Sequence, residues 1–275
     1  MRDALLHDSA GTWHARAGED ARIVCLVPSI TELLCALGLA PQLVGRTGFC
    51  IHPREQLHAI PKLGGTKDVD VTALRALRPS HVILNIDENE KALAATLAGF
   101  VPQLIVTHPL GPLDNPPLYR LLGGIFRREA QAEALCRRFD VALAAVAAQR
   151  DRFATERVLY LIWKKPWMTV AQSTYISATL ALVNWITVPE VAAPRYPSLG
   201  LDEGWLGSVD RVLLSSEPYR FTQKHCDALA QIPTLAGKPV GLIDGEMTSW
   251  YGSRAIEGLG YLARLRLGLM HKPGP

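Results

Sequence analysis

Residues 22–53 read RIVCLVPSITELLCALGLAPQLVGRTGFCIHP, and their pattern is typical of the opening of an α/β domain. The apolar run 23–27 indicates a buried parallel strand, and Pro28 ends it. Ser29 stands three residues before Glu32, which predicts a capping box at the start of an apolar helix. The segment therefore predicts a strand, a tight turn and a helix, in that order.

Composition limits the class of protein. The chain has 275 residues, of which 48% are hydrophobic, so it can bury more than a single ordinary core and two lobes are expected. The net charge is only +3, and no stripe of Lys and Arg is interleaved with aromatics, which argues against nucleic acid as a partner. The apolar runs are far shorter than the roughly 20 residues of a membrane span. We expect a monomer without a membrane span.

The first residues and the cysteines bear on the compartment. Residues 1–21 are polar and mixed in charge, so we interpret them as an N-terminal extension without the pattern of a signal peptide. The five cysteines are odd in number, widely spaced and form no CxxC, so we expect reduced and mostly buried thiols. Both observations favour a cytoplasmic protein, with the periplasm as the alternative.

Strand and helix patterns alternate along the chain and predict two doubly wound lobes with parallel sheets. The Pro-rich segment 109–117 indicates a boundary, and 118–153 has the pattern of one long helix whose weak point is the pair Gly123-Gly124. The predicted organisation is an N-terminal α/β lobe at 22–117, a linking helix at 118–153 and a C-terminal α/β lobe at 154–275.

Ligands of open α/β sheets bind beyond the carboxyl ends of the strands. The unusual residues of this chain follow predicted strands, and many are aromatic, which favours a ligand with a large planar or apolar face. Two alternatives stay open, since the tryptophans could pack on the core and Lys164 and Lys165 could solvate a rim. The candidate ligand-binding residues are Arg46, Phe49, His52, Lys67, Glu88, Trp163, Trp167, Tyr219, Trp250 and Tyr251.

Metal binding and catalysis have little support in the sequence. His52 and Cys50 suit a transition metal, but no HxxxH or CxxC completes a site, so we expect no protein-built metal centre; His52 could contact a metal already held by a chelate. GxSxG, HExxH and Walker-type loops are missing. Asp244 and Glu246 could form a carboxylate pair, although a helix start explains them equally well. We expect no catalytic residues and no intrinsic cofactor.

The segments VPSITELLCALG and LRPSHVILN resemble the helical-backbone (class III) substrate-binding proteins of ABC importers. This resemblance covers about residues 22–269. It implies two Rossmann-like lobes joined by one long helix, with vitamin B12, haem or an iron–siderophore complex bound between the lobes.

The resemblance is weaker at the expected transporter contacts. Glu203, in YPSLGLDE, matches the surface acid with which family members dock on an ABC permease. In the first lobe Thr72 stands where the partner acid is expected, with Asp68 and Asp70 as substitutes.

The sequence therefore predicts non-enzymatic binding of a corrinoid, haem or iron–siderophore chelate. The alternatives are an exported receptor for an ABC importer and a cytosolic enzyme.

Overall fold

The computed structural model describes residues 6–191 and 193–270. It divides into two compact units. Within the described residues, the first unit holds 6–109, 113–139 and 251–254, and the second unit holds the remainder. Each unit contains one four-stranded sheet, and all the strand pairs of both sheets are parallel. The predicted α/β class with two parallel sheets is confirmed.

The sheet of the first unit has the order β2-β1-β3-β4. The helices that connect its strands follow the strand–helix alternation of the sequence. Asp70 caps α3, because its side chain accepts a hydrogen bond from the amide of Ala73. The elements are β1 (Ile23–Cys25), α1 (Pro28–Ala36), η2 (Ala40–Gln42), β2 (Leu43–Arg46), α2 (Arg54–Leu57), α3 (Val71–Ala76), β3 (His81–Asn85), α4 (Lys91–Ala98), β4 (Gln103–Thr107), η3 (Pro112–Asp114) and α5 (Asn115–Ile125).

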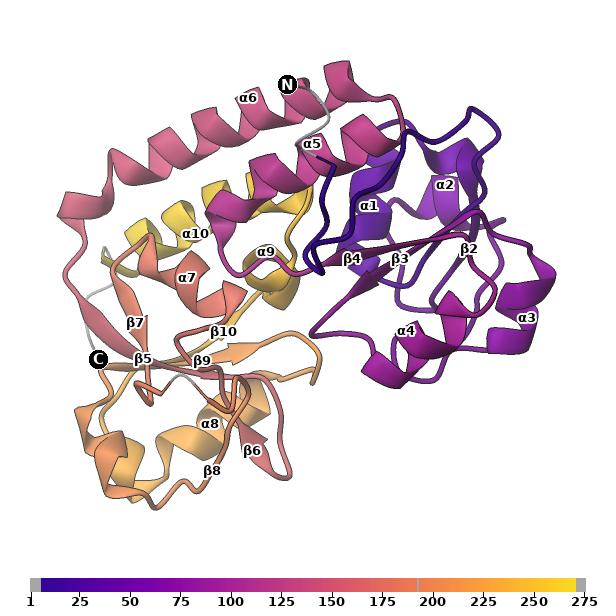
Figure 1. The fold of residues 1–275 in the computed structure, drawn as a ribbon. Coiled ribbons are helices and arrows are strands. Elements are labelled where there is room, and N and C mark those ends of the chain that lie inside the picture. The colour runs from indigo at the N-terminus through magenta and orange to yellow at the C-terminus, as the bar shows by residue number, and fades with distance from the viewer. Residues whose placement is uncertain (1–5, 192, 271–275) are drawn as a thin grey trace. The chain divides into compact units, whose positions relative to one another are not determined.

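Helices cover both faces of this first sheet. Figure 1 shows α3 and α4 on one face and α1 and α5 on the other. Leu74 of α3 and Leu97 of α4 are fully buried against the sheet residues Val24 and Val82. Because both faces are covered, the strands are apolar throughout rather than alternating, which explains the continuous apolar runs of the sequence.

The N-terminal segment is built into the first unit. Asp8 and His14 are buried, and the backbone amides of Ser9 and Val106 tie the segment to β4, the edge strand: Ser9 donates to the carbonyl of Val106, and Val106 donates to the carboxylate of Asp8. Covering an exposed strand edge prevents it from pairing with another chain. The described part of residues 1–21 is therefore a clasp on the sheet rather than a free extension.

Two predictions about helices are wrong. The capping box at Ser29 does not form, because Pro28 is already the first helical residue and the N-cap, Val27, has no side-chain cap. The helix expected over 118–153 is two helices, α5 and α6 (Glu129–Ala147), followed by η4 (Arg150–Arg152). The break is a Schellman motif: Arg127 has a φ of 57°, and the amide of Arg128 donates to the carbonyl of Gly123 at 2.6 Å. The boundary between the units lies inside α6.

The second unit repeats the plan with the sheet order β10-β9-β5-β7. The apolar patterns at 211–215 and 240–243 form strands β9 and β10, whereas β7 was not predicted. The elements are β5 (Glu156–Leu161), β6 (Trp167–Met168), α7 (Tyr175–Ala181), β7 (Trp185–Thr187), β8 (Ser198–Leu199), η5 (Gly204–Ser208), β9 (Arg211–Ser215), α8 (Gln223–Ala230), η6 (Pro233–Leu235), β10 (Val240–Ile243), α9 (Gly245–Ser249) and α10 (Arg254–Met270).

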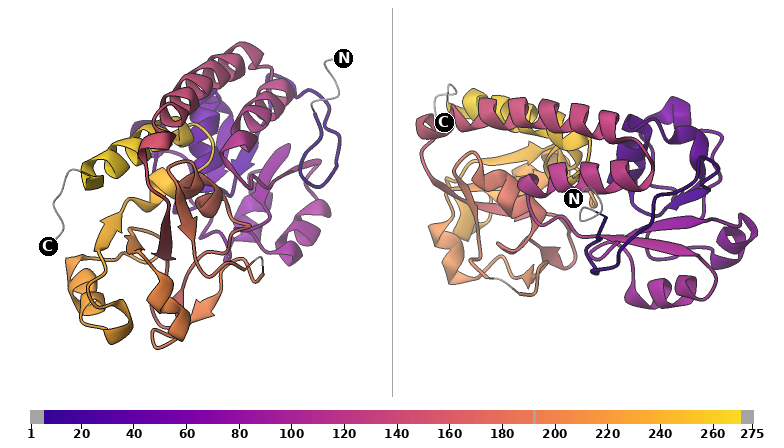
Figure 2. Two further views of the ribbon diagram at one scale, coloured as in Figure 1. Left: turned by 90° about the vertical axis from the view of Figure 1, so that its left-hand side faces the viewer. Right: turned by 45° about the horizontal axis from the view of Figure 1, so that its top comes forward.

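In the second unit, α10 and α8 lie on opposite faces of the sheet, as the yellow and light orange helices of Figure 2 show. Glu156 fixes the start of β5 to α10, because its carboxylate accepts hydrogen bonds from Arg211 at 2.8 Å and Arg266 at 2.6 Å. Burial alone would raise the pKa of Glu156, but these bonds and one from Trp185 lower it to about 2. No helix within the described residues is long and apolar enough to cross a bilayer.

Candidate functional site

Five aromatic side chains gather in the second unit, just beyond the carboxyl ends of β5 and β9. We call them the aromatic cluster. The rings of Trp163 and Tyr219 meet edge-on at 5.6 Å, Tyr219 contacts Phe221 at 4.7 Å, and Trp167 stacks on Phe221 at 6.0 Å with an interplanar angle of 3°. His225 closes the cluster, edge-on to both Tyr219 and Phe221. Phe221 is buried and forms its base, whereas Trp163 is 39% exposed.

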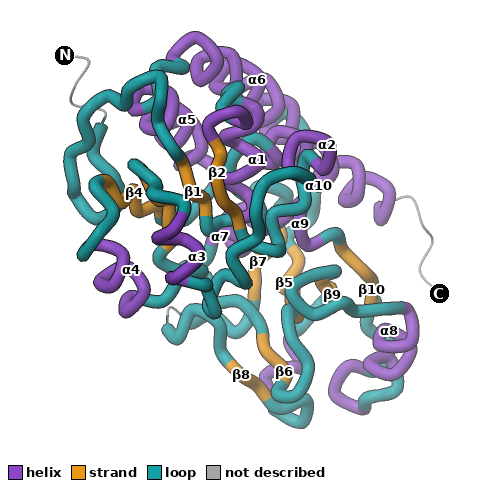
Figure 3. Tube along the Cα trace, turned by 90° about the vertical axis from the view of Figure 1, so that its right-hand side faces the viewer, coloured by secondary structure: helices purple, strands orange, loops and turns teal. Residues whose placement is uncertain are grey.

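Backbone pairing holds the cluster in place. The chain leaves β5 and folds back as a tight hairpin, in which the amide of Met168 donates to the carbonyl of Trp163, and the amide of Ile162 donates back to Met168. Strand β6 then pairs with β8, as the two adjacent orange segments of the second unit in Figure 3 show. The amide of Tyr219 donates to the carbonyl of Ile162 at 3.3 Å, which joins the two loops. The loops that carry the aromatic rings are therefore held by backbone hydrogen bonds rather than free.

The loops that carry the cluster are basic. The ammonium group of Lys164 lies 5.6 Å from the centre of the Trp167 ring, a cation–π distance. Lys165 and Arg220 are exposed on the same two loops, Lys224 is exposed in the first turn of α8, and the segments 163–167 and 219–225 contain no acidic residue. An apolar floor with a positive border suits a ligand that combines a large apolar face with negative charge.

Trp250 is placed differently from Trp163 and Trp167. It is only 8% exposed, and its indole nitrogen donates to Glu217 at 2.8 Å. The same carboxylate oxygen accepts from Ser249 at 2.7 Å. Burial, followed by the charges of Glu246 and Asp244, raises the pKa of Glu217. The ligand contact of Trp250 stays a prediction, and its burial favours a supporting role. Glu217 was not among the candidate residues, and its position after a strand is the one signal that could have found it.

In the first unit, the loops beyond β1, β2 and β3 lie together. Asn89 joins them, because its side chain accepts from the amide of Asn85 at 2.9 Å and donates to the carbonyl of Thr66 at 2.8 Å. Phe49 is 62% exposed and packs beside Gly65, where an added Cβ would lie 3.2 Å from the ring. This arrangement presents a second exposed aromatic at the carboxyl end of a sheet. Sequence reasoning did not identify Asn89.

Arg46 is buried, and its guanidinium donates to the backbone carbonyls of Leu57, Thr47 and Cys50. These bonds hold the loop that carries Phe49. Cys50 is also buried, its sulfur lies 3.1 Å from the hydroxyl of Thr31, and burial raises the pKa of its thiol. A neutral buried thiol is a poor metal ligand. Anion binding by Arg46 stays a prediction, since its described contacts are structural.

Tyr251 and Glu88 form a pair within the first unit. The hydroxyl of Tyr251 donates to the carboxylate of Glu88 at 2.5 Å, and burial followed by that carboxylate raises the pKa of Tyr251 well above its ordinary value. Gly252 positions the tyrosine: it has a φ of 82° and its carbonyl accepts from the hydroxyl of Tyr119 at 2.8 Å. Arg254 then forms a bidentate ion pair with Glu32, with both oxygens at 2.8 Å.

The other predicted residues are placed as follows. His52 is half-buried and Lys67 is exposed, on the loops that flank Phe49. Within the described residues, no group of three or more His, Cys, Asp and Glu side chains could hold a metal ion. The carboxylate of Glu203 accepts hydrogen bonds from the amide of Gly200 and the indole of Trp205. Its role in transporter docking stays a prediction, while the neighbouring Asp202 is the more exposed acid.

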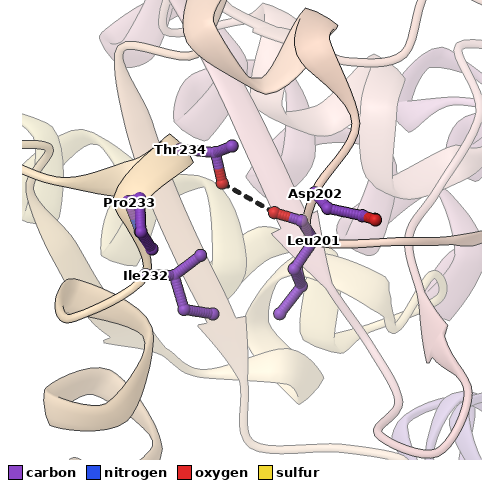
Figure 4. A pocket seen from close by; sticks show the side chains of 5 residues that line it. All are labelled: Leu201, Asp202, Ile232, Pro233 and Thr234. Atoms are coloured by element: carbon purple, nitrogen blue, oxygen red, sulfur yellow. Dashed lines mark hydrogen bonds between the residues drawn. The ribbon is translucent and has the colours of Figure 1, made fainter.

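An open pocket lies away from the aromatic cluster in sequence, between the segments that precede β9 and β10. Figure 4 shows its lining, in which the hydroxyl of Thr234 donates to the carbonyl of Leu201 at 2.6 Å. The lining residues are Leu201, Asp202, Ile232, Pro233 and Thr234. Because these loops precede their strands, the pocket is not at the carboxyl ends where ligands of such sheets bind.

The chain belongs to the periplasmic binding protein family, whose family model matches residues 23–193, more than half of the chain. This family consists of non-enzymatic solute-binding proteins. The fold is that of the class III periplasmic binding proteins, as the sequence predicted. No curated protein matches the chain.

Solved structures confirm the fold. The periplasmic vitamin B12 binding protein BtuF of Vibrio cholerae superposes with a TM-score of 0.78 at 15% identity, over 91% of this chain and 98% of BtuF. The periplasmic heme-binding protein RhuT of Roseiflexus sp. RS-1 gives 0.75 at 21% identity, over 89% and 97%. S. aureus IsdE complexed with heme gives 0.73 at 17% identity, over 90% and 98%. At such identities the likeness establishes the fold alone.

Proposed function

We propose that the protein binds a metal chelate with a large apolar face, of the corrinoid, haem or iron–siderophore type, against the aromatic cluster of the second unit. The single observation that carries this proposal is the cluster itself: Trp163, Trp167 and Tyr219 present partly exposed rings on two hydrogen-bonded loops at the carboxyl end of a parallel sheet. Relatives of the same fold bind vitamin B12 or heme, which supports the same class of ligand.

The first unit holds candidate ligand-binding residues of its own. Phe49 is the exposed aromatic of that unit, and the Tyr251–Glu88 pair and His52 lie on the loops at the same sheet end. Arg46 and Asn89 then act by holding these loops. Delivery to an ABC permease through Glu203 is the further role that family membership supports, and the compartment, cytoplasmic or periplasmic, follows from whether such delivery occurs.

Titration of purified protein with hemin, cyanocobalamin and a ferric siderophore, followed by tryptophan fluorescence, tests the proposal. Trp163→Ala is the informative variant, because the ring is 39% exposed and its loss costs little packing. Loss of an aromatic contact of this kind costs about 2 kcal/mol at an interface hot spot, so the affinity for the ligand should fall at least tenfold. Trp13→Ala is the matched control, since Trp13 is 50% exposed on the N-terminal clasp of the first unit.

Unchanged affinity in Trp163→Ala and in Trp167→Ala would place the site elsewhere. Failure of all three probes to bind the wild-type protein would refute the ligand class. Fractionation of native cells tests the compartment, because a cytoplasmic protein and a periplasmic receptor separate cleanly in that measurement.

A further inference from the structure

We propose that Tyr219 is a specificity-determining residue whose hydroxyl donates a hydrogen bond to the ligand, so that the aromatic cluster selects chelates with a carboxylate at the edge of their apolar face. This inference rests on the proposed function and names the chemistry of the ligand at that same site. It depends on the hydrogen-bond direction that His225 imposes on Tyr219.

Hydrogen bonds at the start of α8 determine the tautomer of His225. The backbone amide of Thr222 donates to Nδ1 of His225 at 3.0 Å. An amide N–H can only donate, so Nδ1 must carry a lone pair, and the Thr222 hydroxyl lies 3.0 Å from the same nitrogen. In a neutral imidazole the proton is then on Nε2. The start of α8 therefore fixes which ring nitrogen of His225 is a donor.

The tautomer of His225 in turn determines the direction of its hydrogen bond with Tyr219. Nε2 of His225 lies 3.3 Å from the hydroxyl oxygen of Tyr219. Because Nε2 carries the proton, His225 donates and the tyrosine oxygen accepts. Among the described residues, His225 is the hydrogen-bond partner of that hydroxyl. The tyrosine proton thus remains available for an acceptor that is not part of the cluster.

The surroundings of the Tyr219 hydroxyl favour one kind of acceptor for its proton. An edge-on contact with Trp163 at 5.6 Å and a tilted contact with Phe221 at 4.7 Å hold the Tyr219 ring, so its hydroxyl has a fixed position beside the apolar floor. Arg220 on the same loop and Lys224 in the first turn of α8 are exposed, while Glu217, the acid of this loop, accepts hydrogen bonds from Ser249 and Trp250. A donor hydroxyl with neighbouring cations favours a carboxylate over a neutral amide.

Hemin and hemin dimethyl ester provide the test, because they share the ring and differ in the charge of the two edge groups. Tyr219→Phe keeps the ring and removes the hydroxyl. A hydrogen bond to a charged group contributes about 1.5–3 kcal/mol and a neutral one about half of that. Tyr219→Phe should therefore weaken hemin binding at least about tenfold and ester binding at least about threefold less than hemin binding. Trp163→Ala, the control, should weaken both ligands equally.

Equal losses of hemin and ester affinity in Tyr219→Phe would overturn the inference. So would binding of cyanocobalamin without binding of hemin, which would leave the proposed function intact. Failure of every chelate to bind would refute both. A long-range ¹H–¹⁵N spectrum of the imidazole nitrogens provides an independent readout: the Nε2–H form of His225 is expected, and the Nδ1–H form would contradict the argument.

Discussion

Replacing Asp8 by alanine should destabilise the first unit strongly, although Asp8 belongs to a segment that looks like a polar extension. The carboxylate accepts four hydrogen bonds: from the amides of Ala10, Thr12 and Val106, each at 2.9 Å, and from Nε2 of His14 at 3.1 Å. Both side chains of the Asp8–His14 pair are fully inaccessible to solvent. Asp8→Ala leaves the histidine and the edge of β4 without their partner.

Removing one member of a buried ion pair costs about 3–5 kcal/mol, because the other charge stays buried and uncompensated. Urea unfolding, monitored by circular dichroism, measures this change in the free energy of unfolding. Glu19→Ala is the matched control: Glu19 is an exposed acid of the same segment, and its loss should change stability by less than about 0.5 kcal/mol. Equal stabilities of Asp8→Ala and Glu19→Ala would refute the role of the clasp.

The same pair predicts a pH dependence. Burial alone would lower the pKa of His14, but the hydrogen bonds to Asp8 and Gln103 raise it above its ordinary value of 6.5. The stability that its charge contributes is therefore complete below about 6.5 and is lost as the pH rises through the folded pKa. The stability gap between wild type and His14→Gln should be larger at about pH 6 than at about pH 9. A gap that does not change with pH would contradict the ion pair.

His81, near this pair, has the opposite dependence. Burial, followed by the charge of His14, lowers the pKa of His81 to about 4. Its contribution to stability is complete above the ordinary value of 6.5 and declines as the pH falls toward 4. Asp8 itself has a lowered pKa because its hydrogen bonds outweigh burial, so its contribution is lost only below its ordinary value of 3.8.

Three further predictions concern other parts of the chain. Glu156→Gln should lower the free energy of unfolding of the second unit by about 3 kcal/mol, because Arg266 is buried and keeps its charge; a thermal unfolding midpoint that does not fall would contradict this. The five buried thiols should react with a thiol reagent only in denaturant, since burial raises the pKa of Cys35 to about 11 and raises that of Cys50 as well; rapid labelling of the native protein would disprove it. Glu203→Ala should leave ligand affinity unchanged and impair uptake in cells if the protein serves an importer, whereas an uptake defect together with weaker ligand binding would argue against a docking role.

The architecture was predictable because both sheets are covered on both faces. A fully covered strand is apolar along its whole length, so a run such as 23–27, in which every residue is buried, is visible in the sequence. The break between α5 and α6 was not predictable, because the left-handed C′ position holds Arg127 where a glycine usually gives the signal. The three-residue strand β7 was also missed.

The candidate site was predictable only in part. Strand ends locate the loops, so Trp163 and Tyr219 could be identified from their positions after β5 and β9. What the sequence does not reveal is which polar atoms each side chain already uses: Arg46 is occupied by three carbonyls, and Trp250 by Glu217. These partners lie 1 to 33 positions away along the chain, and only the folded backbone orients them toward these side chains.

The visible absorption spectrum of the protein, isolated from its native host and then incubated with hemin, cyanocobalamin or a ferric siderophore and desalted, shows whether the aromatic cluster binds a metal chelate. We expect that one of these chromophores stays with the wild-type protein and is released at least tenfold more readily from Trp163→Ala than from Trp13→Ala. A protein that retains no chromophore, or whose Trp163→Ala variant retains it as firmly as the wild type, would contradict the assignment of the aromatic cluster as a metal-chelate site.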